Sequence, residues 1–172
     1  MDLSNSRTFN LKSIQHIAKN CVELTVLNLE STNILEDEAH YLVQNLTPKL
    51  KRINLGTLYN KDPDKHIKIL VERCDQLQEI HLKYYVPITD SAITSIEEEL
   101  KNTLETIELY PCRKISYSKL LEVLQEMTKL KNVQVHKFIS RPNEEIRNLR
   151  VKHPDVEINE DEYLDILEYR YS

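Results

Sequence analysis

Three consecutive glutamates, Glu97, Glu98 and Glu99, place three carboxyl groups next to one another in the sequence. Two carboxyl groups can act as a general acid and a general base when a substrate binds between them. Here the glutamates stand at the polar end of a segment whose apolar residues have helical spacing, and nothing in the sequence brings a substrate to them. We interpret them as a solvated helix face rather than as an acid–base pair.

The six histidines and three cysteines are scattered along the chain. Cys21, Cys74 and Cys112 match no zinc-ligand spacing and form a poor disulfide framework, so we expect reduced thiols. Cys21 and Cys74 precede apolar stretches and are expected in the core, and Cys112 where a strand turns into a loop. No histidine is placed to activate a thiol, and His40 and His66 fall on expected outer helices. The sequence therefore predicts no catalytic residue, no metal, no cofactor and no enzyme activity.

The overall composition excludes further classes of function. The formal net charge is −5 at pH 7 and no run of lysine or arginine occurs, so neither nucleic acid nor a membrane is expected as a partner. The single glycine, Gly56, argues against loops that cradle nucleotides. The chain contains no signal-peptide pattern and no run of about 18 apolar residues. We expect a protein of the cytoplasm, the nucleus or both.

A phrase of the form Leu-x-x-(Leu/Ile/Val)-x-(Leu/Val) recurs every 26 or 27 residues. Its copies begin at Leu24, Leu50, Leu77, Leu104 and Leu130, and a degenerate sixth copy covers His153–Ile158. This period is typical of leucine-rich repeats. The predicted fold class is α/β: a leucine-rich-repeat solenoid that forms an arc, with parallel strands on the concave face and helices on the convex face.

Each repeat is expected to contribute one strand and one helix. The expected helices cover 38–46, 64–73, a segment with Thr89 or Asp90 as its N-cap, 117–127 and 143–151. Their inward stripes include Ile67, Leu70 and Val71 in one helix and Leu120, Leu121 and Leu124 in another. Residues 13–20 resemble the helix of a preceding repeat whose strand is missing or rudimentary near Phe9. The predicted organisation is a partial repeat over 1–23, leucine-rich repeats over 24–158 and a tail or cap over 159–172.

The residues beside the buried strand positions should form columns across the concave face, because they project the same way. The first column is Val26, Arg52, Glu79, Thr106 and Asn132; the second is Asn28, Asn54, His81, Glu108 and Gln134; the third is Glu30, Gly56, Lys83, Tyr110 and His136. Two interpretations are compatible with these columns: a solvent-exposed sheet face without a binding role, and a surface that binds a partner.

Aromatic and charged residues gather just past the strands of the C-terminal repeats, and such side chains anchor protein interfaces. The predicted partner-binding residues are His81, Lys83, Tyr84, Glu108, Tyr110, Arg113, His136 and Tyr163. Tyr110 is the expected anchor, flanked by Lys83 and His136, in a site that could accept an acidic or phosphorylated segment. The tail that contains Tyr163 either caps the last repeat or returns along the concave face.

The cysteines recur at a fixed place in the repeats: Cys21 and Cys74 each stand three residues before the first leucine of a copy. Together with Ile107–Cys112 and Ile88–Ile93, this pattern resembles the leucine-rich-repeat F-box protein family. The likeness runs from about Thr47 to Tyr163 and includes the stretches 51–56, 70–77, 130–135 and 153–158.

In that family an F-box docks on the Skp adaptor of a Skp–cullin–F-box ubiquitin ligase, and the repeats recruit the protein to be ubiquitylated. The resemblance also implies a small adaptor held by residues after the strands, here Tyr59, Tyr84 and Pro111 or Arg113, together with Tyr163. Only about 20 residues precede the first full copy, too few for an F-box. The chain is thus expected to be either a fragment or a set of repeats that acts alone.

The expected function is a protein-recognition module that resembles the substrate-recruiting repeats of such a ligase receptor without its F-box. Its expected partner is a protein substrate or adaptor on the concave face, with ubiquitin ligase subunits as further partners if the chain is part of a longer one. The alternative is a free-standing leucine-rich-repeat scaffold or inhibitor with no link to ubiquitin.

Overall fold

The computed structural model describes residues 1–6, 10–32, 34–55, 62–82, 88–109, 112, 114–136, 147 and 150–161 of the chain. Of residues 117, 124, 136 and 159–161 it describes the backbone but not the side chain.

The described strands form a six-stranded, all-parallel sheet whose order in space, β1-β2-β3-β4-β5-β6, is the order in the sequence. The strands are β1 (Val26–Asn28), β2 (Arg52–Asn54), β3 (Glu79–His81), β4 (Thr106–Leu109), β5 (Asn132–His136) and β6 (Glu157–Asp161). The expected sixth copy is therefore present as a strand, and it runs three residues beyond the predicted end of the repeats at residue 158.

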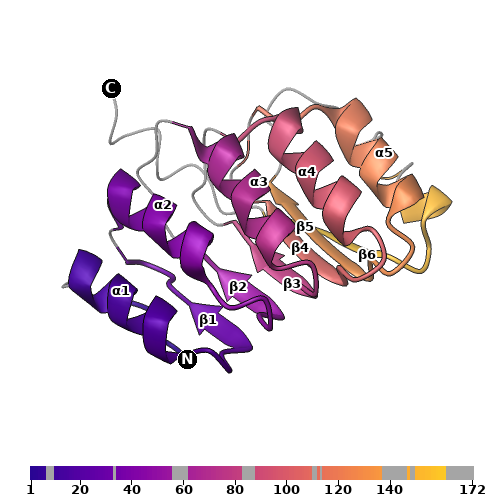
Figure 1. The fold of residues 1–172 in the computed structure, drawn as a ribbon. Helices are drawn as coiled ribbons and strands as arrows, with labels where there is room; N and C mark the ends of the chain where they lie inside the picture. The colour runs from indigo at the N-terminus through magenta and orange to yellow at the C-terminus, as the bar shows by residue number, and fades with distance from the viewer. Residues whose placement is uncertain are drawn as a thin grey trace, which may run out of the picture.

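The helices lie side by side in a second layer on one face of this sheet (Figure 1). They are α1 (Leu11–Asn20), α2 (Glu36–Asn45), α3 (Pro63–Arg73), α4 (Asp90–Leu100) and α5 (Tyr117–Glu126). Parallel neighbours need a crossover connection, and crossovers have one preferred hand. Because each strand is added on the same side of the last one, every crossover helix falls on the same face. The prediction of an α/β fold with parallel strands is confirmed.

The helix starts follow from capping residues. The Thr89 side chain accepts a hydrogen bond from the Ser91 amide and caps α4, as expected, while Ser116 caps α5 through the Lys119 amide. The helix expected over 38–46 begins two residues earlier in α2, where Glu38 Oε2 accepts a hydrogen bond from the Leu35 amide at 2.9 Å. Of the helix expected over 143–151, only residue 147 and residues 150–151 are described, and all are helical.

The core lies between the sheet and the helices and contains the apolar residues of the repeated phrase. Equivalent residues are stacked in register: Leu27 pairs with Ile53, Ile53 with Ile80, Ile80 with Ile107, and Ile107 with Val133. All five are buried. A hydrophobic core made of stacked equivalents is continuous along the sheet, so each unit depends on its neighbours.

The inward stripe predicted for α3 is confirmed, and that of α5 is confirmed in part, with Leu121 packed against the core. Leu120 is buried as expected, whereas Leu121 is only half-buried and Val123 takes a core position. The side chain of Leu124 is outside the described part of the chain. The packing of α5 on the sheet turns Val123 inward, a rotation that the run of leucines does not reveal.

The first residues of the chain pair with the outer edge of β1. The Leu3 amide donates to the Asn28 carbonyl at 2.9 Å, the Asn28 amide donates to the Met1 carbonyl at 3.0 Å, and the Asn5 amide donates to the Glu30 carbonyl at 2.8 Å. Among the described residues of this segment, parallel pairing is limited to a single bridge between Asp2 and Asn28. The rudimentary strand of the first unit is thus found here, while Phe9, where it was expected, lies outside the described residues.

Candidate functional site

The face of the sheet opposite the helices, here called the open face, carries the polar columns that the sequence predicts. Strand register aligns Arg52 with Glu79 and Thr106, and it aligns Asn54 with His81 and Glu108. The first two columns are therefore confirmed as neighbours across the strands. Of the third column, Glu30 is described, His136 ends β5 without a described side chain, and the other members lie outside the described residues.

A groove of about 450 Å³ crosses the open face. Its lining comes from five neighbouring strands and their ends: Val26, Leu27, Asn28, Glu30, Arg52, Ile53, Asn54, Glu79, His81, Glu108 and Gln134. This volume lies within the usual range for binding sites of small ligands or a few side chains. We call it the open-face groove.

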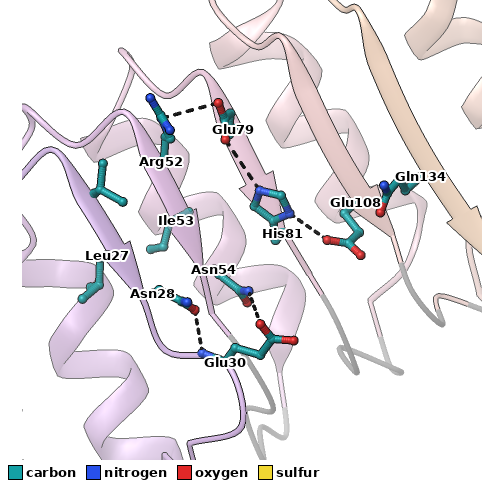
Figure 2. Close-up of a pocket in the computed structure, with 11 residues that line it drawn as sticks. Leu27, Asn28, Glu30, Arg52, Ile53, Asn54, Glu79, His81, Glu108 and Gln134 are labelled. Atoms are coloured by element: carbon teal, nitrogen blue, oxygen red, sulfur yellow. Dashed lines mark hydrogen bonds and ion pairs between the residues drawn. The ribbon is translucent and has the colours of Figure 1, made fainter. Parts of the chain in front are cut away.

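Four side chains, Arg52, Glu79, His81 and Glu108, are linked across three strands of the groove (Figure 2). His81 Nδ1 lies 2.7 Å from Glu108 Oε2, and His81 Nε2 lies 3.8 Å from Glu79 Oε2. On the other side of Glu79, its Oε1 lies 3.4 Å from Arg52 Nε. The column positions that the sequence predicts thus become a connected chain of polar contacts.

These side chains differ in depth. Glu108 is 8% exposed, His81 29%, Glu79 34% and Arg52 56%. The carboxylate of Glu108 therefore lies at the floor of the groove, and the guanidinium of Arg52 lies at its rim. The short contact between His81 Nδ1 and Glu108 requires a proton on one of the two atoms. A proton on Nδ1, donated to the carboxylate in a hydrogen bond, meets this requirement.

Amide side chains occupy the N-terminal part of the open-face groove. Asn28 Oδ1 accepts a hydrogen bond from the Glu30 amide at 3.0 Å, and Asn54 Nδ2 donates to Glu30 Oε2 at 3.5 Å. Asn28 thereby orders the chain just after β1, where Ser31 has a positive φ of 57°. Glu30 is held beside the second column.

The groove offers hydrogen bonding and ion pairing more than bond-making chemistry. None of its described lining residues is a serine, threonine, cysteine or lysine, so no hydroxyl, thiol or amine nucleophile of these types stands beside His81 in the described lining. Within the described residues, no group of three or more histidine, cysteine, aspartate or glutamate side chains is arranged to hold a metal ion. The two ring nitrogens of His81 face two different carboxylates.

The structure brings two of the predicted partner-binding residues together, His81 and Glu108. The remaining predictions cannot be placed: Lys83, Tyr84, Tyr110, Arg113 and Tyr163 lie outside the described residues, as do Tyr59 and Pro111, and the side chain of His136 is not described.

The sequence prediction placed the site toward the C-terminal repeats and omitted several residues that line the open-face groove. Asn28, Glu30, Arg52 and Glu79 extend it to the N-terminal strands. The signal was present, because all four belong to the predicted columns. The polar side chains of these four residues are a weaker local signal for an interface than the aromatic residues near Tyr110.

The glutamate cluster is only partly a solvated face. Glu98 and Glu99 are exposed, but Glu97 Oε2 lies 2.6 Å from Lys119 Nζ, and that amine also lies 3.0 Å from Glu122 Oε1. Burial lowers the pKa of Lys119, yet the hydrogen bonds and charges of Glu97 and Glu122 outweigh it and hold that pKa above its usual value. Glu97 therefore links α4 to α5, and the interpretation of this residue as solvated is wrong.

All three cysteines are free thiols, as expected. Cys74 and Cys112 are buried, with the Cys74 thiol donating to the Thr47 carbonyl at 3.5 Å. Burial raises the pKa of Cys74 to about 12, and burial likewise raises the pKa of Cys112, so neither is a ready nucleophile. Cys21 is only half-buried, contrary to the core position predicted for it, because it follows the end of α1 at the edge of the fold.

His66 lies on an outer helix, α3, as predicted, but it is buried between that helix and α2. Its ring meets that of His40 edge-on at a centroid distance of 5.4 Å, and its Nδ1 has no hydrogen-bond partner among the described residues. Burial and the neighbouring His40 lower the pKa of His66. The pair has no third ligand among the described residues and is a packing contact between helices.

The chain matches no protein-family model and no curated protein. Among the described residues, no helix combines the length and the apolar character needed to cross a lipid bilayer. The function therefore has to be inferred from the repeats and from the open face.

Proposed function

We propose that this protein is a leucine-rich-repeat recognition module that binds another protein on its open face and catalyses no reaction. In this proposal it resembles the substrate-recruiting repeats of a Skp–cullin–F-box ubiquitin ligase receptor.

The repeat period and the strand pairing support the leucine-rich-repeat part of the proposal. Residues 26 or 27 positions apart, such as Leu27, Ile53 and Ile80, pair across neighbouring strands. Stacking one repeat on the next produces this register, and it leaves the helices on one face and the strands on the other. In a solenoid of this kind the strand face is a broad surface for partners.

The open-face groove is the observation that carries the binding part of the proposal. An ordinary wetted sheet would have side chains that each face water separately. Here the imidazole of His81 is held between the carboxylates of Glu79 and Glu108 beside a groove of about 450 Å³. Preorganised polar groups lose little conformational entropy when a partner binds, which favours recognition.

A capture experiment tests the open face directly. The chain would be immobilised and exposed to cell lysate, and proteins retained by the wild type would be compared with those retained by Glu79→Lys and by the control Glu98→Lys. Glu98 is exposed on α4, on the helix side of the molecule. We expect Glu79→Lys to lose partners that Glu98→Lys keeps. Equal retention by both variants would remove the open face as the binding surface.

The ubiquitin link is supported by the resemblance of the repeats and not by the open-face groove, which would serve a free-standing scaffold or inhibitor equally well. Because the resemblance covers repeats only, we expect this chain alone not to bind the Skp adaptor. Size-exclusion chromatography of the two purified proteins checks this. Co-elution at micromolar concentration would show a docking surface within these residues, and capture of cullin and Skp from lysate by a longer chain would favour the ligase over the scaffold.

A further inference from the structure

Among the described lining residues of the open-face groove, the carboxylates lie deeper than the guanidinium of Arg52. Glu108 forms part of the floor and Glu79 lies at intermediate depth, whereas Arg52 is more than half exposed at the rim. Glu30 adds a third carboxylate to the lining. The described lining contains three carboxylates but only one guanidinium and one imidazole. The whole chain is also negative, with a formal net charge of −5.

The ion pair between Arg52 and Glu79 is the exchangeable part of this arrangement. Its atoms are 3.4 Å apart and both side chains are substantially exposed, so solvent screens the attraction. Arg52 is not among the residues of the hydrophobic core, and its side chain is 56% exposed, so it can turn out into water. A cation brought by a partner could then take its place at Glu79.

We propose that the open-face groove binds a short segment of a partner protein that carries lysine or arginine side chains, with one cationic group replacing Arg52 at Glu79. This inference rests on the proposed function, since it assigns the chemistry of the segment that the open face recognises. A guanidinium fits best, because its planar fork can pair with a carboxylate through two hydrogen bonds.

The other polar residues of the groove suit a peptide. Asn28, Asn54 and Gln134 carry side-chain amides, which offer both donors and acceptors to a peptide backbone. An acidic or phosphorylated segment would meet the carboxylates of Glu79 and Glu108, and Arg52 is the one guanidinium or ammonium group among the described lining residues. Nucleic acid would suffer the same repulsion along its whole backbone.

Peptide selection followed by affinity measurement tests the proposal. A phage-displayed library of random heptapeptides would be selected on the wild-type chain, and the enriched peptides would be synthesised. Their affinities would be measured by fluorescence polarisation for the wild type and for three variants: Glu79→Gln, Arg52→Gln and the control Glu98→Gln. Thermal melting would first verify that each variant is folded.

We expect the enriched peptides to contain lysine or arginine. Glu79→Gln should weaken the binding of these peptides about fivefold, which is the effect expected from losing a partly exposed ion pair. Arg52→Gln should strengthen peptide binding about twofold to fivefold, because it removes the competing cation. Glu98→Gln should leave the affinity unchanged. Raising the salt concentration should weaken binding to the wild type. An increase in affinity on loss of Arg52 is a result that a purely structural role of this residue would not produce.

Two other outcomes separate the failure of this inference from that of the proposed function. If acidic or uncharged peptides are enriched, and Glu79→Gln or Arg52→Gln still changes their affinity, the open face binds proteins but the cationic assignment is wrong. If no peptide is enriched, or if affinities are insensitive to both open-face variants, the inference and the proposed recognition surface both fail.

Discussion

Glu108 carries a carboxylate that is almost entirely buried, although it lines a groove on the open face. A buried carboxylate is costly unless hydrogen bonds and opposite charge compensate for the lost water. His81 Nδ1, at 2.7 Å, supplies one such contact, and the two residues stand one repeat apart in the sequence. At the scale of single residues, the groove therefore depends on a pairing between neighbouring repeats.

Removing the imidazole should destabilise the protein. We expect His81→Ala to lower the free energy of unfolding by about 2 kcal/mol, because a hydrogen bond to a charged and buried group is lost. Urea denaturation would measure the change. Gln134→Ala, at an exposed position of the same column, is the matched control and should have little effect. If both variants unfold at the same urea concentration as the wild type, the contact with Glu108 contributes nothing to stability.

His66 should make the protein less stable in mild acid. Its pKa in the folded chain lies below the ordinary value of 6.5. Burial lowers this pKa most, followed by the neighbouring His40, and Lys65 lowers it slightly. Glu36 and Asp62 act in the opposite direction but do not outweigh these effects. Between these two pKa values the unfolded chain binds more protons than the folded chain. The free energy of unfolding should therefore fall as the pH decreases from about 6.5 toward the folded-state pKa.

Urea unfolding of the wild type and of His66→Phe between pH 7.5 and pH 5 checks this expectation. The aromatic ring of the variant fills similar space but cannot take up a proton. We expect a smaller loss of stability on acidification in the variant. The same pH dependence in both proteins would assign it to other groups.

At the scale of elements, neighbouring helices are tied together by repeated polar contacts. The Thr89 amide donates to Asp64 Oδ1 at 2.9 Å, and the Ser116 amide donates to Asp90 Oδ1 at 2.6 Å. In both cases the N-cap residue of one helix bonds to a carboxylate in the first turn of the helix before it. Helix starts are thus aligned from repeat to repeat.

The contact of α4 with α5 also contains an ion pair between Glu97 and Lys119. Breaking this ion pair should strongly destabilise the protein. Lys119 is 8% exposed and its partner Glu97 is 15% exposed, so removing the amine leaves a largely buried carboxylate without its cation. We expect Lys119→Met to cost about 3 kcal/mol of stability, in the range seen for broken buried pairs. Chemical denaturation would show the cost, and the double variant Glu97→Gln/Lys119→Met should recover part of it. Glu98→Ala, on the exposed side of α4, should change little.

At the scale of the whole molecule, stability is shared between neighbours because each strand contributes only a few buried side chains. Ile107 lies in β4, between Ile80 of β3 and Val133 of β5, and it is fully buried. Fully burying one such residue contributes roughly 1.5–3 kcal/mol, too little for one repeat to offset its own ordering. The sheet should therefore fold as one cooperative unit rather than repeat by repeat.

A charge in the middle of this sheet should disrupt both of its halves. We expect Ile107→Asp to lower the melting temperature strongly or to prevent folding, since an unpaired buried carboxylate costs several kcal/mol. Ile158→Asp, in the edge strand β6, should be milder, because this position has one described neighbouring strand instead of two. Circular dichroism melting compares them. An Ile107→Asp variant that melts like the wild type would show that the stacked register is not what stabilises the fold.

Much of the fold could be predicted from the sequence because its signals are local. Alternation of apolar and polar residues identifies which side of a strand is buried, and a period of 26 or 27 residues identifies which residues become neighbours. The alignment of Asn54 with His81 and of His81 with Glu108 follows from these two regularities alone. The start of α4 follows from Thr89 for the same reason, because its side chain caps the helix.

The tertiary structure alone decided how deep each polar side chain lies and which neighbour it meets. A glutamate on a helix surface can face water or the next helix, and only the packing of α4 on α5 directs Glu97 to Lys119 while Glu98 stays exposed. In the same way, the packing of α2 on α3 buries His66. Burial depends on the rotation of each helix and on the side chains of its neighbours, and spacing along the sequence encodes neither.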